Sequence, residues 1–135
     1  MDKIKQLKNW DVLRKECPLL YKNGFAFECG AGWYNIIHDL SIKIEKILKD
    51  YAENHKVVEG EENEKIEMFA IQLKEKYGTL RFYMSCETKE IQDLIEDAEA
   101  LSSQTCENCG SFGKMRDKGW IEVKCDDCFS GGKSL

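Results

Sequence analysis

The hydrophobic positions of the chain follow a helical spacing in two long segments. Over residues 33–51 the apolar side chains recur at i, i+3, i+4 and i+7, and lysines and glutamates occupy positions between them. This pattern predicts an amphipathic helix that ends near His55. A second stripe covers residues 91–101, and Thr88 before it is a favourable N-cap residue. Each helix must bury its apolar face against another element.

Between these helices the spacing changes to every second residue, which predicts a β-hairpin. Its two apolar sets flank the turn sequence "EKYG" and comprise Phe69, Ile71, Leu73, Leu80, Phe82 and Met84. Gly78 supplies the positive φ that such a turn requires. The apolar face is expected to pack against the helix of residues 33–51. The opposite face carries Gln72, Lys74, Thr79, Arg81 and Tyr83.

The other segments of the body carry weaker patterns. The first twenty residues predict one or two short helices that stop before Pro18, because proline biases the preceding residue away from the helical region. Residues 23–33 read as a loop or short strand punctuated by glycines. The acidic stretch "EGEENEKIE" at 59–67 predicts an exposed loop.

The most specific chemical signal is a pair of CxxC motifs near the end of the chain. Cys106, Cys109, Cys125 and Cys128 spell C-x2-C-x15-C-x2-C, a spacing typical of tetrahedral zinc sites. Each CxxC turns two thiolates toward one ion, and a hairpin with Gly119 in its turn returns the second pair to the first. We expect one structural Zn2+, since four cysteines leave no coordination position for a reacting water. A pair of redox-active dithiols is the less specific alternative.

Together these elements predict an α+β fold with two long helices packed on a β-hairpin, followed by a C-terminal zinc ribbon. Residues 1–104 would form the α+β body. Residues 105–135 would form the zinc-ribbon element, packed on the body, because no flexible linker separates the two.

Composition and charge narrow the class of protein. A chain of 135 residues can bury one core, and its net charge of −5 argues against a general nucleic-acid binder. No stretch approaches the length of a membrane span, and the N-terminus lacks the apolar run of a secretory signal. Seven cysteines, an odd number, argue against a secreted disulfide framework. These features predict a cytoplasmic protein.

The ribbon has a balanced charge. Residues 106–135 contain five basic and five acidic side chains, and four thiolates around Zn2+ add two negative charges. The ribbon therefore has no excess of positive charge with which to bind the phosphates of a nucleic acid. Trp120 together with Arg116 could stack on a base. The favoured interpretation is that Trp120 and Ile121 pack the ribbon onto the body.

Two further segments are candidates for binding. The polar hairpin face offers recognition chemistry for a ligand or partner, with Trp120 helping from the ribbon, through Gln72, Lys74, Arg81 and Tyr83. The alternatives are a solvated sheet face, or a pairing of Arg81 with Glu75 or a helix carboxylate. The amides of Gly30 and Gly32 precede a helix and could cradle an anion, but a tight loop entering the helix is favoured.

No catalytic constellation accompanies these candidates. The acidic residues are spread along loops and helix faces, and His38 falls at the boundary of the apolar stripe. A nucleophile elbow, a P-loop and an HExxH motif are all absent from the sequence. The chain therefore leans toward a non-enzymatic role.

Four stretches together resemble a known group of proteins. "CGAGWYNIIHDL", "IQLKEKYGTLRFY", "AEALSSQTCENCG" and "CDDC" are similar in order and wording to small proteins encoded by bacteriophages and prophages, over roughly residues 25–128. The resemblance implies a phage protein acting in the bacterial cytoplasm. It supplies no catalytic residue.

The sequence leaves three functional hypotheses. The leading one is a non-enzymatic phage-type accessory protein that binds a host or phage macromolecule, in the first place a protein, for example as a counter-defence inhibitor. The hairpin face or the acidic loop would make the contact. The second is a nucleic-acid-binding regulator that uses the ribbon. The third is a nucleotide or small-anion binder that uses Gly30, Gly32 and Arg81. The oligomeric state stays open.

Overall fold

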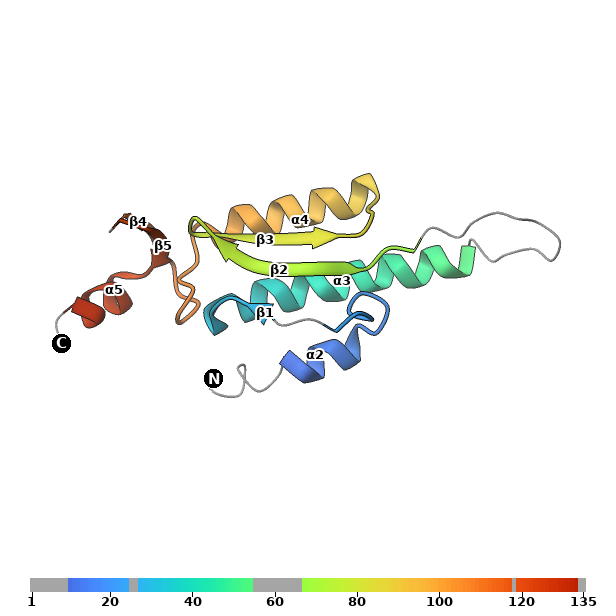
Figure 1. Ribbon diagram of the computed structural model, residues 1–135, viewed down its shortest axis with the longest axis horizontal. Helices are drawn as coiled ribbons and strands as arrows, with labels where there is room; N and C mark the ends of the chain where they lie inside the picture. The colour runs from blue at the N-terminus through green and yellow to red at the C-terminus, as the bar shows by residue number, and fades with distance from the viewer. Residues whose placement is uncertain (1–9, 25–26, 55–66, 118, 134–135) are drawn as a thin grey trace.

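A computed structural model of the chain describes residues 10–24, 27–54, 67–117 and 119–133. Within these ranges the chain forms four α-helices and two small sheets, which confirms the mixed α+β class (Figure 1). The elements in order are α2 (Trp10–Glu16), β1 (Phe27–Glu28), the 3-10 helix η1 (Ala31–Trp33), α3 (Tyr34–Asn54), β2 (Ala70–Lys76), β3 (Thr79–Met84), α4 (Lys89–Ser102), β4 (Lys114–Asp117), β5 (Ile121–Lys124) and α5 (Asp126–Lys133).

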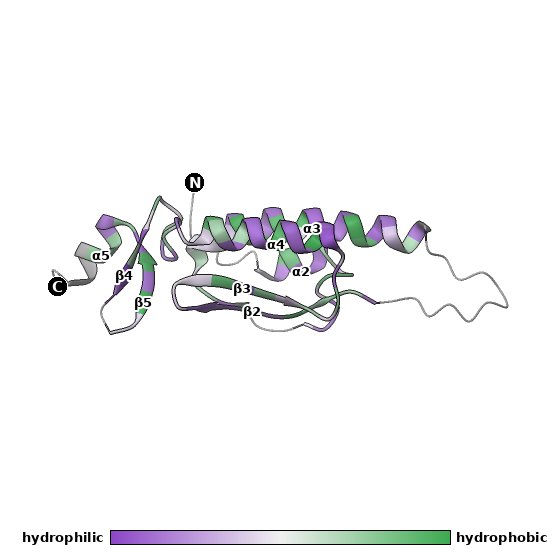
Figure 2. Cartoon of the chain, turned by 90° about the horizontal axis from the view of Figure 1, so that it is seen from above, coloured by the Kyte–Doolittle hydropathy of each residue, from purple (hydrophilic) through white to green (hydrophobic). Residues whose placement is uncertain are grey.

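The larger sheet has the strand order β1-β2-β3, with β1 parallel to β2 and β2 antiparallel to β3. Helices α3 and α4 both lie on one side of β2 and β3 (Figure 2). The two long helices and the hairpin are therefore present. The short strand β1 and the helices α2 and α5 extend this plan. In the part of the chain that is described, no helix is both long and apolar enough to cross a membrane.

The core lies between the two helices and the sheet. The predicted stripe of α3 is buried at Ile37, Leu40 and Ile44, and that of α4 at Ile91 and Ile95. The Thr88 hydroxyl accepts a hydrogen bond from the Ile91 N–H at 3.2 Å, which confirms the predicted N-cap. Helix α3 ends at Asn54, one residue before the expected end, and the predicted acidic loop lies almost entirely outside the described residues.

The hairpin turn is as expected, but one strand departs from simple alternation. Tyr77 and Gly78 both have positive φ, 53° and 82°, and join Lys76 to its partner Thr79. The register shifts between Ala70 and Gln72, so Ala70 is fully buried whereas Ile71 is 49% exposed. The prediction that Ile71 belongs to the buried face is therefore wrong, because a β-bulge reverses the alternation at this point.

Side chains of α4 protect the free edge of β3. The Leu80 N–H donates to the buried Ser102 hydroxyl at 2.9 Å, and the Phe82 N–H donates to the Glu99 carboxylate at 3.3 Å. An edge strand with open amides invites pairing with another chain. Strand addition at this edge would therefore have to displace α4.

Replacing Glu99 by glutamine is expected to change how stability depends on pH. Burial raises the pKa of the Glu99 carboxyl above its ordinary value of 4.5, and the Phe82 N–H and Arg81 oppose the rise. A carboxyl whose pKa is higher in the folded chain favours folding at low pH, and this contribution is lost as the pH rises through the folded pKa. Glu99→Gln keeps an acceptor for Phe82 but does not titrate.

The measurement is urea unfolding of both proteins from about pH 4 to about pH 7. The free energy of unfolding of Glu99→Gln, relative to the wild type, should rise with pH. Glu53→Gln, at an exposed position of α3, is the matched control and should show no such trend. A pH-independent difference for Glu99→Gln would contradict the role assigned to burial.

Candidate metal centre and binding face

The four cysteines of the two CxxC motifs converge on one point. All four Sγ atoms lie within 4.8 Å of one another, and those of Cys109 and Cys125 are 3.6 Å apart. A tetrahedral site with metal–sulfur bonds of about 2.3 Å places its sulfurs roughly 3.8 Å apart. The thiols therefore fit a single metal ion. This group, Cys106, Cys109, Cys125 and Cys128, is the one cluster of potential metal ligands found among the described residues.

Local backbone bonds shape both ends of the site. The Gly110 N–H donates to the Cys106 carbonyl at 2.9 Å, and Gly110 has a positive φ of 84°. Together they close the tight turn of the first CxxC pair, here called its knuckle. The second pair follows the β4–β5 hairpin, and the Cys128 N–H donates to the Cys125 sulfur at 3.3 Å. The predicted hairpin between the pairs is confirmed, with Gly119 at φ 95° in its turn.

The electrostatics of the cluster favour a bound cation. A hydrogen bond from Ser111 lowers the pKa of Cys109 to about 6. Burial, followed by the neighbouring thiols, raises the pKa of Cys128 to about 12. Several thiolates this close together repel one another, and a divalent ion removes this repulsion by binding all of them. Four sulfur ligands close the shell, so the arrangement suits a structural site.

His38 does not belong to this centre. His38 lies on α3, where its Nε2 is 3.7 Å from a carboxylate oxygen of Glu16. His55 lies outside the described residues. The expected boundary position of His38 is confirmed, since its side chain is 36% exposed.

The glycine loop before α3 docks on the first cysteine knuckle. The Gly30 N–H donates to the Glu107 carboxylate at 2.8 Å, and the Gly32 N–H donates to the Glu107 backbone carbonyl at 2.7 Å. The indole N–H of Trp33 donates to the Thr105 carbonyl at 2.9 Å. The carboxylate and the backbone carbonyl of Glu107 thus occupy the two glycine amides that an external anion would need. The favoured reading of this segment as a tight loop fits these contacts.

The tip of the first hairpin makes a second contact with the ribbon. A Cβ placed on Gly78 would lie 2.9 Å from the Ile121 side chain, so the turn and β5 approach closely. Ile121 therefore packs on the body as predicted. Trp120 is 63% exposed, and the prediction that it also packs the ribbon onto the body is wrong. It lies just before β5, outside the strands that carry the other candidate binding residues.

Arg116 is committed to contacts within the ribbon. Its guanidinium donates to the Asp126 carboxylate at 2.7 Å and to the Lys124 carbonyl at 3.2 Å, and it lies 4.6 Å from the centre of the Phe129 ring. The Arg116 side chain is 16% exposed. Stacking of Arg116 with Trp120 on a base would require these contacts to break. The ribbon therefore offers little support for nucleic-acid binding.

Four of the five predicted binding residues lie on the face of the larger sheet that α3 and α4 do not cover. We call this the open sheet face. Gln72 is opposite Tyr83, and Lys74 is opposite Arg81, in the β2–β3 register. Leu73, Leu80 and Phe82 are buried on the side that α3 and α4 cover. The residues that alternate with them along the two strands therefore point to the opposite side. Glu75 belongs to the covered side and accepts the Gly78 N–H, so the alternative pairing of Arg81 with Glu75 is wrong.

Comparisons with protein-family models, with curated proteins and with solved structures found no match for this chain.

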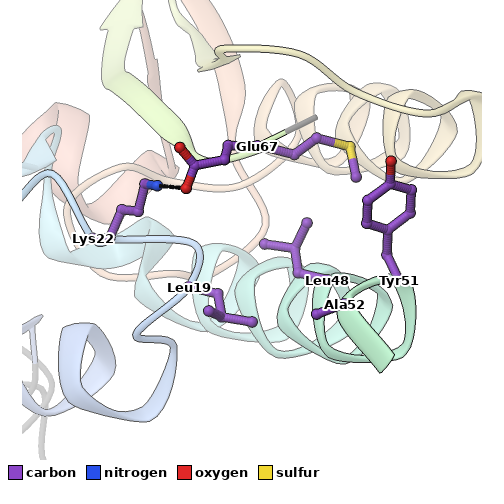
Figure 3. A pocket seen from close by; sticks show the side chains of 7 residues that line it. Leu19, Lys22, Leu48, Tyr51, Ala52 and Glu67 are labelled. Carbon is purple, nitrogen blue, oxygen red and sulfur yellow. Dashed lines mark hydrogen bonds and ion pairs between the residues drawn. The ribbon is translucent and has the colours of Figure 1, made fainter. Parts of the chain in front are cut away.

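A small pocket lies near the end of α3 (Figure 3). Leu48 and Tyr51 form its apolar wall, and Lys22 pairs with Glu67 at its mouth. Its volume is about 80 Å3. Pockets that hold drug-sized molecules measure about 300–1,000 Å3, so this one suits a few waters.

Proposed function

We propose that this chain is a non-enzymatic binding protein whose open sheet face contacts another protein, with the ribbon held by one structural zinc ion. The observation that carries the proposal is the shared face of Gln72, Lys74, Arg81 and Tyr83. Arginine and tyrosine are enriched at protein contact sites, where they combine apolar area with directional hydrogen bonds. The face is a rigid pleated surface, so a partner meets a preformed arrangement.

Zinc is the metal we propose for the cysteine centre. Four thiolates in a closed tetrahedral shell suit Zn2+ better than the hard cations Mg2+ and Ca2+, which prefer oxygen ligands. When bound, the ion would cross-link the two knuckles. Its four ligands leave no site for substrate, which supports a structural rather than a catalytic role.

We place this binding function in a phage context. The motif order resembles that of small phage and prophage proteins, and such accessory proteins act in the bacterial cytoplasm. A partner from the host, for example a component of a defence system, is the extension of this proposal. Nothing in the geometry favours the regulator or nucleotide alternatives over it, because Arg116 and the Gly30–Gly32 amides are used internally.

Affinity capture from bacterial lysate tests the proposal. The tagged wild type should retain a stoichiometric protein that mass spectrometry identifies. The double variant Gln72→Ala/Tyr83→Ala should lose it at least tenfold, since contact residues near the centre of an interface typically contribute about 1–2 kcal/mol each. Gln92→Ala/Leu101→Ala is the matched control on α4, where Leu101 is 53% exposed, and should retain the partner.

Equal loss in both double variants would assign the contact to a different surface. Retention of the partner by the sheet-face variant would contradict the proposal directly. Circular dichroism and metal content of each variant establish that the fold is unchanged, because all four substituted side chains lie at the surface or only partly buried.

A further inference from the structure

We propose that Lys74 and Arg81 form an oxyanion-binding site on the open sheet face, and that it receives a side-chain carboxylate of an acidic protein partner. This inference rests on the proposed function and names the chemistry of its partner. It is carried by three observations on these two residues: their register, their lack of ion pairs, and a buried donor atom without an acceptor.

The first observation is a like-charged pair in direct cross-strand register. Lys74 on β2 is opposite Arg81 on β3, with both side chains on the same face. Like charges directly opposite each other destabilise a sheet. A sequence that keeps such a pair where a neutral or opposite charge would be more stable violates a local rule of folding. Violations of this kind concentrate at functional sites.

The second observation is that neither cation is neutralised within the described part of the chain. No ion pair or hydrogen bond involves the ammonium of Lys74 or the guanidinium of Arg81 there. Two carboxylates lie nearby. Glu28 is in register with Lys74 on β1, and Arg81 opposes the rise of the Glu99 pKa. The charge of Arg81 thus acts on Glu99, but neither carboxylate lies within ion-pair distance of either cation, and Glu99 accepts the Phe82 N–H instead.

The third observation is the Nε atom of Arg81. Among the described residues it is the one buried side-chain nitrogen or oxygen that lacks a hydrogen-bond partner. A buried donor without an acceptor is unfavourable, and a charged one more so. Arginine presents its N–H groups as a planar fork that matches both oxygens of a carboxylate. The terminal nitrogens of the Arg81 fork would donate to an incoming carboxylate, and Lys74 would add a second positive charge. Nε is buried in this structure and would join the contact once the Arg81 side chain turns outward.

The neighbours of the pair set the class of ligand. Gln72 and Tyr83 lie beside it and add hydrogen-bonding groups and an aromatic ring that is 40% exposed. The site thus combines a small concentrated positive charge with contact area for the carbon chain of a glutamate or aspartate. Nucleic acid would require a longer series of phosphate contacts, and a chain of net charge −5 disfavours its approach. An acidic protein segment therefore fits the face better.

Nuclear magnetic resonance of the zinc-loaded full chain tests this inference with three probes: a hexaglutamate peptide, a single-stranded oligonucleotide of matched charge, and inorganic phosphate. Hexaglutamate should shift the Nε–H signal of Arg81 saturably and bind more tightly than the other two probes. Lys74→Gln/Arg81→Gln should weaken hexaglutamate binding at least tenfold. Arg81→Lys should retain only part of the affinity, because lysine keeps the charge without the planar fork.

Lys46→Gln/Lys49→Gln is the matched control, since it removes two exposed positive charges from α3. It should leave the affinity within twofold of the wild type. An unchanged Arg81 Nε–H signal with hexaglutamate would overturn the inference, as would equal weakening by the control. Tighter binding of the oligonucleotide would overturn the choice of an acidic protein, and tighter binding of phosphate would assign the site to a free anion.

Lysate capture separates the failure of this inference from the failure of the proposed function. If the captured partner is lost with Gln72→Ala/Tyr83→Ala but retained with Lys74→Gln/Arg81→Gln, the face binds a protein and the oxyanion site is wrong. If both variants retain the partner, the proposed function fails as well. Loss with both variants supports the two together.

Discussion

Removal of the metal by a chelator, or substitution of Cys109 by serine, is expected to unfold the C-terminal ribbon and to destabilise the body. The ribbon has a single fully buried aliphatic side chain among its described residues, Val123, and cannot hold its shape by a core of its own. Metal binding to such elements supplies on the order of 10 kcal/mol of folding free energy. Loss of the ion removes that contribution. It also leaves four cysteines without a ligand, whose thiolates repel one another and whose thiols can be oxidised.

Unfolding of the ribbon should also destabilise the body, because three N–H groups of the body donate hydrogen bonds to the ribbon. The N–H groups of Gly30, Gly32 and the Trp33 indole all donate to residues 105–107. Unfolding of the ribbon leaves these donors without protein partners at the start of α3. We therefore expect the fluorescence of the buried Trp33 to change upon chelation, and the melting temperature of the body to fall.

Metal analysis and thermal unfolding provide the measurement. The wild type should contain one zinc ion per chain, and Cys109→Ser less than half of that. Cys86→Ser is the matched control, because Cys86 is an exposed thiol outside the cluster, and its zinc content and melting temperature should equal those of the wild type. A Cys109→Ser protein with full zinc content and unchanged stability would contradict the assignment of the four-cysteine centre.

The parts of the fold that the sequence predicts well are those set by local spacing. Two CxxC pairs with a hairpin between them converge because each knuckle and the turn are defined within a few residues. The stripes of α3 and α4 are long enough for their period to be unambiguous, and Thr88 marks the start of α4. The alternation of side chains between the two faces of β2 and β3 likewise places Lys74 and Arg81 on one face.

The features that sequence reasoning missed depend on contacts between distant segments. The bulge at Ile71 adds one residue that no alternation reveals. Glu107 reaches the amide of Gly30 across 77 positions of sequence, so the internal partner of the glycine loop was not foreseeable. The sequence predicts that Trp120 and Ile121 together pack the ribbon onto the body, whereas Trp120 is 63% exposed and the close approach to Gly78 is made by Ile121. In each case tertiary geometry decides between two locally equal options.

The glycine loop yields the second large effect: Gly32→Ala is expected to separate the body from the ribbon. A Cβ at Gly32 would lie 2.2 Å from the Cys106 carbonyl oxygen and 2.5 Å from the Glu107 carbonyl carbon. Both are backbone atoms beside the metal centre and cannot rotate away. The loop must therefore withdraw, which breaks the hydrogen bond from the Gly32 N–H to Glu107. We expect a loss of about 3 kcal/mol in the free energy of unfolding.

Gly24→Ala provides the matched control because it separates crowding from backbone strain. Gly24 has a positive φ of 56° and no atom within 4 Å of its added Cβ, so alanine there should cost about 1 kcal/mol through strain alone. The affinity for zinc distinguishes the two further. Gly32→Ala should weaken it, because the body no longer holds the Cys106 knuckle in place, whereas Gly24→Ala should leave it unchanged. Equal zinc affinity in Gly32→Ala and the wild type would mean that the ribbon forms its metal site without support from the body, and that the two fold as separate units.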